Sequence, residues 1–239
     1  MSDVWQNYCV SIPRQFLPER RMSNTSFLPR DRYQQALFVL FLLAVLGSCI
    51  NPPYADYLLM QHVPTLLAAI LLPYLSNRWA ISRPSFLSII IFLCLHTLGA
   101  RYLYSYVPYD AWSERLLGIN ISEAFGFGRN HYDRLVHFSY GLLLAVPIQE
   151  FERRHFQLSA RLSAVLAIEC ILATSAAYEL IEWLVAVAFK PDWADQFLGQ
   201  QGDMFDAQKD MALATAGAAL SVAIQASINH DRLVNTRPN

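Results

Sequence analysis

Six apolar segments, each long enough to cross a membrane, constrain this chain more than any other feature of its sequence. A helix needs about 20 apolar residues to span a hydrocarbon core about 30 Å thick. Because lipid cannot hydrogen-bond to an exposed backbone, all six segments are predicted to be helices. The sequence therefore predicts an all-α, polytopic membrane protein, a six-helix transmembrane bundle whose spans are residues 33–50, 58–75, 84–104, 132–151, 161–189 and 210–229.

The composition agrees with this class of protein. Of the 239 residues, 54% are hydrophobic and only 15% are charged, whereas soluble domains carry about 25% charged residues. The formal net charge of −1 favours neither a nucleic acid nor an acidic partner. We therefore expect the lipid bilayer as the surroundings of the chain, and no nucleic acid as a partner.

The distribution of basic residues predicts the orientation of the bundle, because the side richer in lysine and arginine faces the cytoplasm. Twelve such residues lie on one side: Arg14, Arg20, Arg21, Arg30, Arg32, Arg78, Arg83, Arg153, Arg154, Arg161, Arg232 and Arg237. Five lie on the other: Arg115, Arg129, Arg134, Lys190 and Lys209. Both termini are therefore predicted to be cytoplasmic.

This orientation divides the chain into three parts. Residues 1–32 form a cytoplasmic segment that is expected to be poorly ordered. Residues 33–229 form the transmembrane domain, with outer loops at 105–131 and 190–209, and residues 230–239 form a cytoplasmic tail. Tyr104 and the aromatic residues near it are interpreted as an interfacial belt at the outer surface.

Polar side chains are concentrated at the start of the fourth predicted span. The stretch RNHYDRLVHFSYG, residues 129–141, holds five titratable side chains within nine residues. Asp133 and His137 are four residues apart and therefore share one face of a helix, and Tyr140 follows them. In the predicted orientation these side chains lie near the outer leaflet.

Three other segments bring ionisable groups to the same depth. The third span carries His96 and Arg101 in its outer half, and the fifth carries Glu179 and Glu182 near its outer end. The last loop and the sixth span add Asp203, Asp206 and Asp210. An ionisable residue inside a span costs roughly 2.5–3.5 kcal/mol on insertion scales. The convergence therefore indicates either a functional polar cavity or a structural network of salt bridges.

Acid–base chemistry is one use of such a cavity. His137 is predicted to be a general base that Asp133 orients. Glu179 and Glu182, three residues apart on one helix face, would serve as the acid or as metal ligands. These four residues are the candidate catalytic set.

Arginines near this set could bind an anionic substrate, because a guanidinium group binds two phosphate oxygens at once. Arg129, Arg134 and Arg101 are predicted to bind phosphate, and Tyr140 completes the candidate substrate-binding set. Their place at the outer leaflet suits the head group of a lipid phosphate or a polyprenyl phosphate.

A divalent metal is the alternative to metal-free chemistry. Imidazole and carboxylate groups bind zinc, manganese or magnesium. The candidate ligands are His96, Asp203, Asp206 and Asp210. The H-E-x-x-H signature of metalloproteases does not occur, so the sequence leaves the cofactor open.

Three functions remain open from the residues alone. The first is an enzyme or binding protein that acts on an amphipathic, phosphate-bearing envelope molecule. The second is a small-solute or proton-coupled transporter, although no internal repeat supports one. The third is a non-catalytic membrane scaffold, in which the polar groups only hold helices together.

Four motifs resemble one bacterial family. HTLGARYLYSYVP, RNHYDRLVHFSYG, YELIEW and LGQQGDMFDAQKDM together are similar to the YjdF-type inner-membrane proteins, and the similarity covers about residues 30–230. The resemblance implies a six-helix, multi-pass protein of the bacterial inner membrane. It implies no activity.

A fainter resemblance, over about residues 130–225, is to the VanZ-like proteins, which are linked with glycopeptide resistance. The positions that match their motifs are Asp133, His137, Phe138, Glu179, Asp206, Asp210 and Gly217. Arg134, Glu182 and Ala214 stand where that family usually has lysine, glutamine and asparagine. The resemblance implies a context of envelope lipids or peptidoglycan precursors.

Overall fold

Every element in the described part of the chain is a helix. The computed structural model describes residues 28–188 and 201–235, and the all-α prediction is confirmed there. The helices are α1 (Arg32–Ser48), α2 (Ala55–Gln61), α3 (Val63–Trp79), α4 (Arg83–Arg101), α5 (Tyr109–Leu117), α6 (Ile121–Phe125), α7 (Tyr132–His155), α8 (Ala160–Ala188) and α10 (Asp206–Asn235). The expectations for residues 1–27, 189–200 and 236–239 lie outside the described residues.

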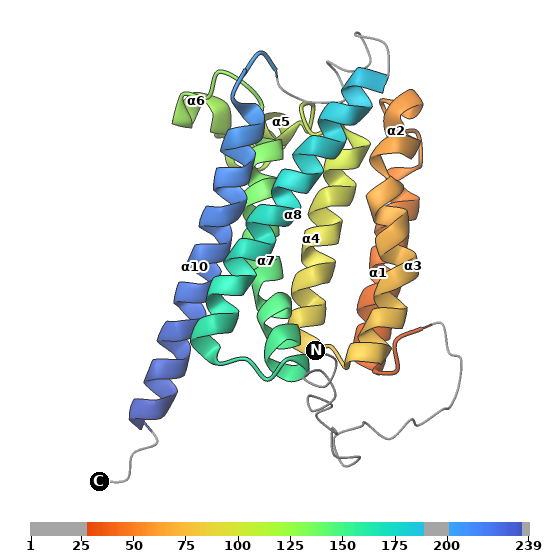
Figure 1. Ribbon diagram of the computed structural model, residues 1–239. Helices are drawn as coiled ribbons and strands as arrows, with labels where there is room; N and C mark the ends of the chain where they lie inside the picture. Colours follow the sequence, from red (N-terminus) through yellow and green to blue (C-terminus); the bar gives the residue numbers. More distant parts are fainter. Residues whose placement is uncertain (1–27, 189–200, 236–239) are drawn as a thin grey trace, which may run out of the picture.

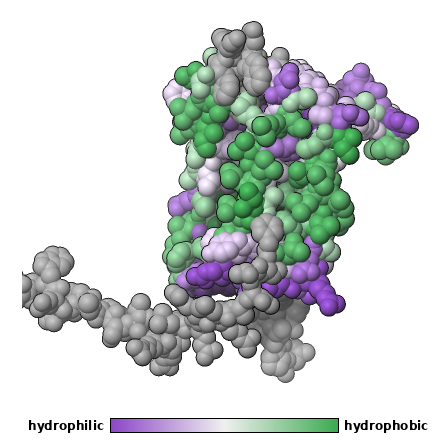
Figure 2. All heavy atoms as spheres, turned by 90° about the vertical axis from the view of Figure 1, so that its right-hand side faces the viewer, coloured by the Kyte–Doolittle hydropathy of each residue, from purple (hydrophilic) through white to green (hydrophobic). Residues whose placement is uncertain are grey.

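The long helices run alongside one another, and the short helices α2, α5 and α6 all lie at the same end of the bundle, which is the upper end in Figure 1. The starts of α7 and α10 lie at this upper end as well, whereas the α3–α4 and α7–α8 connections lie at the lower end. Apolar side chains cover the middle of the face in Figure 2, with polar side chains above and below them. This pattern is the one that a bilayer requires.

Four stretches of helix are long and apolar enough to cross a membrane: Ala55–Trp79, Arg83–Arg101, Ala160–Ala188 and Asp206–Ile228. The helix α1 is apolar but has only 17 residues, and α7 has 24 residues but carries charged groups at both ends. The count of six crossings and the cytoplasmic position of the termini therefore stay predictions.

The second predicted span is a helix broken at His62, which separates α2 from α3. The buried imidazole lies 2.9 Å from the Ser48 hydroxyl through Nε2 and 3.2 Å from the Thr65 hydroxyl through Nδ1. Pro64, in the first turn of α3, lacks the N–H that would continue the α2 ladder. The break thus joins the end of α1 to the start of α3.

Two glycines allow α7 and α10 to touch backbone to backbone. A Cβ on Gly141 would overlap the carbonyl oxygen of Ala214, and a Cβ on Gly217 would overlap the carbonyl oxygen of Phe138. Small residues at a helix crossing permit this approach in membranes. The contact holds the first turns of α10 against the first turns of α7, where the sequence places its ionisable groups.

Candidate functional site

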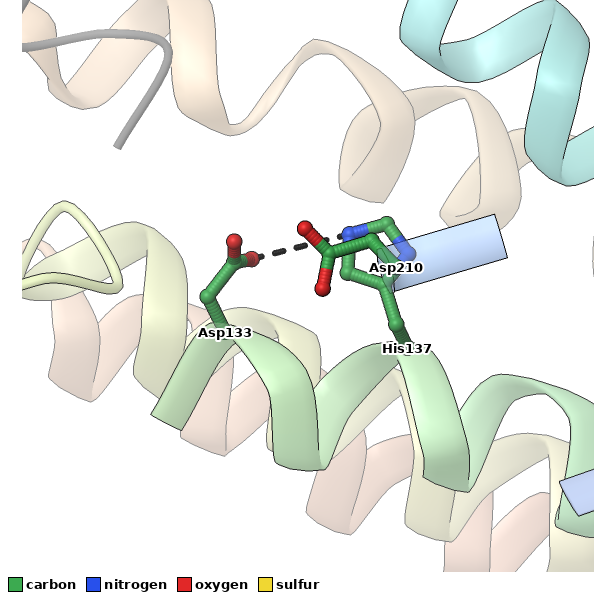
Figure 3. Close-up of side chains that lie close together, drawn as sticks. All are labelled: Asp133, His137 and Asp210. Atoms are coloured by element: carbon green, nitrogen blue, oxygen red, sulfur yellow. Dashed lines mark ion pairs between the residues drawn. The ribbon is translucent and has the colours of Figure 1, made fainter. Parts of the chain in front are cut away.

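Three ionisable side chains meet at the upper end of the bundle. Asp133 and His137 project from the same face of α7, and Asp210 approaches them from α10 (Figure 3). One ligand atom from each of the three lies within 4.8 Å of the other two. The spacing of four residues on α7 and the close α7–α10 crossing together produce this arrangement.

A fourth group comes from α8. The Nε2 atom of His137 lies 3.6 Å from Asp133 Oδ1 and 3.8 Å from Glu179 Oε1. Both separations exceed the 2.7–3.2 Å range of ordinary hydrogen bonds, so the imidazole lies between two carboxylates without a close bond to either. We call Asp133, His137, Glu179 and Asp210 the carboxylate–histidine group.

This group is buried and incompletely satisfied. Asp210 is only 2% exposed, and the side chains of the other three are between 11% and 14% exposed. Glu179 Oε1 and Asp210 Oδ1 are buried without a hydrogen-bond partner. An unsatisfied buried polar group costs about 1–3 kcal/mol, and more when it is charged. A proton, a water molecule or a cation bound between these side chains would satisfy the unpartnered oxygen atoms.

A second set of charges lies beside the first, and each carboxylate in it has a cationic partner. Arg129 holds Asp206 at 2.5 Å and lies 3.9 Å from Asp203. Asp203 also accepts hydrogen bonds from Arg134 and Lys209, both at 2.5 Å. The hydrogen bond from Lys209 is the main reason that the pKa of Asp203 is lowered to about 2. We call Arg129, Arg134, Asp203, Asp206 and Lys209 the ion-paired group.

A cavity of about 260 Å³ opens beside the carboxylate–histidine group, between α3, α4, α7 and α8. Asp133, His137 and Glu182 line its polar part, and Pro64, Ala68, Phe92 and Leu93 line its apolar part. We call it the polar cavity. Glu182 also lines a second cavity of about 460 Å³ between α8 and α10, together with Glu179 and Asp210. The group is thus bordered by open volume on two sides.

Tyr104 is a cavity residue that sequence reasoning placed elsewhere. Leu103 and Tyr104 adopt left-handed backbone angles, with φ of 52° and 55°, and this turn directs the Tyr104 ring back over Gly99. Its hydroxyl bonds His96 Nδ1, and His96 Nε2 remains buried without a partner. The signal in the sequence was Gly99, because any side chain there would collide with the ring. Tyr104 therefore lines the polar cavity instead of joining the expected aromatic belt.

Two of the predicted substrate-binding residues make contacts within the bundle. Arg101 donates to the carbonyl groups of Ser48 at 2.6 Å and Ile50 at 2.9 Å, so it binds the C-terminal end of α1. The Tyr140 hydroxyl lies 2.7 Å from that of Thr174, in the wall of the polar cavity. Tyr140 thus lies near His137, whereas Arg101 is hydrogen-bonded to the end of α1. A role of either residue in substrate binding stays a prediction.

An apolar groove of about 560 Å³ extends from the polar cavity toward the lower end of the bundle. The two share Ala68, Phe92 and Leu93. Below these residues the groove is lined mainly by aliphatic and aromatic side chains of α3, α4 and α7, among them Leu71, Leu75, Ile89, Leu144, Ile148 and Phe151. Three charged residues of the last turns of α7, Glu150, Glu152 and Arg154, line it as well. The polar cavity and the apolar groove are therefore adjacent and share part of one wall.

Comparison with known proteins agrees with this architecture. Residues 33–232 match the family described as "Predicted membrane protein (DUF2238)". The chain is 34% identical over 165 residues to the inner membrane protein YjdF of Escherichia coli strain K12, covering 69% of this chain and 75% of that protein. It is thus a relative of that protein and not the E. coli protein itself. No solved structure matches the chain, and the VanZ-like resemblance finds no support among these matches. The chain belongs to the DUF2238 family of predicted membrane proteins.

Proposed function

We propose that this inner-membrane protein binds or acts on an amphipathic, phosphate-bearing molecule of the cell envelope, with its head group at the carboxylate–histidine group. The observation that carries the proposal is the junction of the polar cavity with the apolar groove at Ala68, Phe92 and Leu93. Ligand sites commonly combine apolar walls with a few convergent polar groups. A hydrocarbon chain in the groove would bring the head group of the same molecule to His137.

The phosphate is favoured by the arginines beside the site. Arg134 Nε is a buried donor without a hydrogen-bond partner, although another nitrogen of the same guanidinium pairs with Asp203. A phosphate oxygen is a strong acceptor for such a donor. Arg129 and Arg134 therefore remain the candidate phosphate-binding residues, with most of their charge already balanced by aspartates.

The outer leaflet is the proposed location of the head group. Arg78, Arg83, Arg153, Arg154 and Arg161 belong to the helix ends and connections at the lower end of the bundle. Under the positive-inside rule this end faces the cytoplasm. The carboxylate–histidine group, at the opposite end, would then face the outer leaflet.

Lipid that co-purifies with the full-length protein in mild detergent tests the proposal. We expect mass spectrometry to identify one phosphate-bearing lipid enriched at least tenfold over bulk membrane lipid, and we expect His137→Ala to lose the enrichment. Glu169→Gln is the control, because Glu169 is an exposed carboxylate on α8 outside the residues that line the cavities described above. Equal lipid profiles for the wild type and His137→Ala would reject the proposal, as would substrate uptake by proteoliposomes without lipid enrichment, which favours a transporter.

A further inference from the structure

The charges at the site do not balance once the ion pairs are assigned. Arg129 and Arg134 pair with Asp206 and Asp203, and Lys209 is a third cation beside Asp203. The neighbouring carboxylate–histidine group contributes three carboxylates and one imidazole, so negative charge remains in excess. A phosphate head group would add further negative charge to it. Burying like charges together is costly unless a cation joins them. The negative side chains of the site therefore outnumber its positive ones, and a bound cation would offset the difference.

Asp210 supplies an independent observation that points to a ligand. It is 2% exposed, its Oδ1 atom is buried without a hydrogen-bond partner, and its carboxylate is directed at the imidazole and toward Asp133 (Figure 3). A carboxylate that was only structural would be expected to have a donor within reach, as Asp206 has in Arg129. Asp210 instead faces two other potential ligands.

The distances suit ligands that share one ion. Two ligand atoms, each about 2.0–2.2 Å from a tetrahedral metal ion, lie about 3.4 Å from each other. The separations from His137 Nε2 to the carboxylate oxygens of Asp133 and Glu179 are 3.6 and 3.8 Å. These separations are too long for hydrogen bonds. The ligand atoms of Asp133, His137 and Asp210 lie within 4.8 Å of one another, so a side-chain movement of about 1 Å is needed for Asp210 to share the ion.

We propose that Asp133, His137 and Asp210 bind a divalent metal ion, zinc or manganese, with Glu179 as a fourth ligand. One imidazole with carboxylates suits these two ions, whereas magnesium prefers oxygen ligands alone. His96, Asp203 and Asp206, which the sequence offered as ligands, contact Tyr104 and the arginines instead. Among the four predicted ligands, Asp210 is the one that belongs to the proposed set.

The metal changes the role expected for His137. A metal-bound Nε2 has no lone pair for a proton, so His137 acts as a ligand and not as a general base. Glu182, which lines the polar cavity beside His137, is then the carboxylate placed to accept a proton. A fifth position on the metal, beyond its four protein ligands, would take a phosphate oxygen; this last step rests on the proposed function, whereas the metal site does not.

The metal content of the full-length protein, purified in detergent and measured by mass spectrometry, is the first test. We expect about one equivalent of zinc or manganese in the wild type. We expect less than one tenth of that in His137→Ala and Asp210→Asn, and unchanged content in Glu169→Gln. Full metal content in Asp210→Asn would overturn the assignment of the ligands.

A second measurement on the wild type avoids dependence on variants that fail to fold. Metal-stripped protein is titrated with Mn²⁺ and examined by pulsed electron paramagnetic resonance. Coupling to an imidazole nitrogen is the expected result, and a protein that neither contains nor takes up zinc or manganese would overturn the inference. Metal binding without lipid enrichment would support the metal site and reject the proposed function. Lipid enrichment in a metal-free protein would reject the metal site and support the proposed function.

Discussion

Asp206 and Asp210 are one turn apart on α10, yet their surroundings differ completely. Asp206 lies 2.5 Å from Arg129 and belongs to a network with a cation for each carboxylate. Asp210 faces an imidazole and another carboxylate, and one of its buried oxygens has no partner. Residues of the same type on the same helix thus fall into two classes. We expect the first class to stabilise the bundle and the second to be held in place by it.

This difference between Asp206 and Asp210 allows two hypotheses to be tested in one site: that its polar groups only hold helices together, and that they bind or react with a ligand. A structural network loses stability when one member is removed, because the remaining charge is left buried. A group kept for binding or chemistry is often strained, so that its removal stabilises the fold. The two classes should therefore respond to substitution with opposite signs.

The largest effect is expected for the ion-paired group. Asp206→Ala leaves the Arg129 charge, whose side chain is 10% exposed, without its main partner. The free energy of unfolding should fall by about 3–5 kcal/mol, measured by chemical denaturation in detergent. The double variant Arg129→Met with Asp206→Leu should recover much of the loss because it leaves no unpaired charge. A loss below about 1 kcal/mol in the single variant would show that this pair is not structural.

A smaller effect of opposite sign is expected for Asp210→Asn in metal-free protein. The amide removes one negative charge and can donate to the carboxylates nearby. The free energy of unfolding should rise by about 1–2 kcal/mol, the size of one unsatisfied polar group. The same denaturation assay in the presence of a chelator measures it. Destabilisation as large as that of Asp206→Ala would show that Asp210 is a structural residue like Asp206, and that the two aspartates do not differ in role.

The smallest effect is a pH dependence of the ion-paired group. The pKa of Asp203 is lowered from 3.8 to about 2, chiefly by the hydrogen bond from Lys209. A lowered pKa stabilises the folded state fully above the unfolded value and loses this contribution as pH falls toward 2. The difference in melting temperature between the wild type and Asp203→Asn should thus be constant from pH 5 to 8 and shrink between pH 4 and 2. A difference that changes near pH 7 would point to another titrating group.

The helices were the part of the fold that the sequence could predict. Each of the six apolar segments overlaps a helix of the described residues, because burial in lipid dictates both composition and hydrogen bonding. The break at His62 was not predicted. It depends on hydrogen bonds to Ser48 and Thr65, and the one to Ser48 is a contact between helices that local sequence does not encode.

The candidate site was predictable as a set of residues but not as a pattern of partners. The spacing of Asp133 and His137 on one helix face follows from helix geometry. Which aspartate meets an arginine depends instead on how α10 approaches α7. The contacts of Arg101 could not be predicted for the same reason. Its depth in the bundle follows from the sequence, but its hydrogen bonds to the end of α1 depend on the relative rotation of two helices.

The close crossing of α7 and α10 at Gly141 and Gly217 is expected to make the site sensitive to helix tilt. Asp210 precedes Gly217 by seven residues, which is about 10 Å along the helix axis. With the crossing as a fulcrum, a rotation of α10 by about 5° moves Asp210 by about 1 Å, a displacement that can cost a catalytic site about a hundredfold in rate. Since the thickness of a bilayer influences the tilt of the helices within it, we expect the convergence of these acidic side chains to depend on the lipid that surrounds the protein.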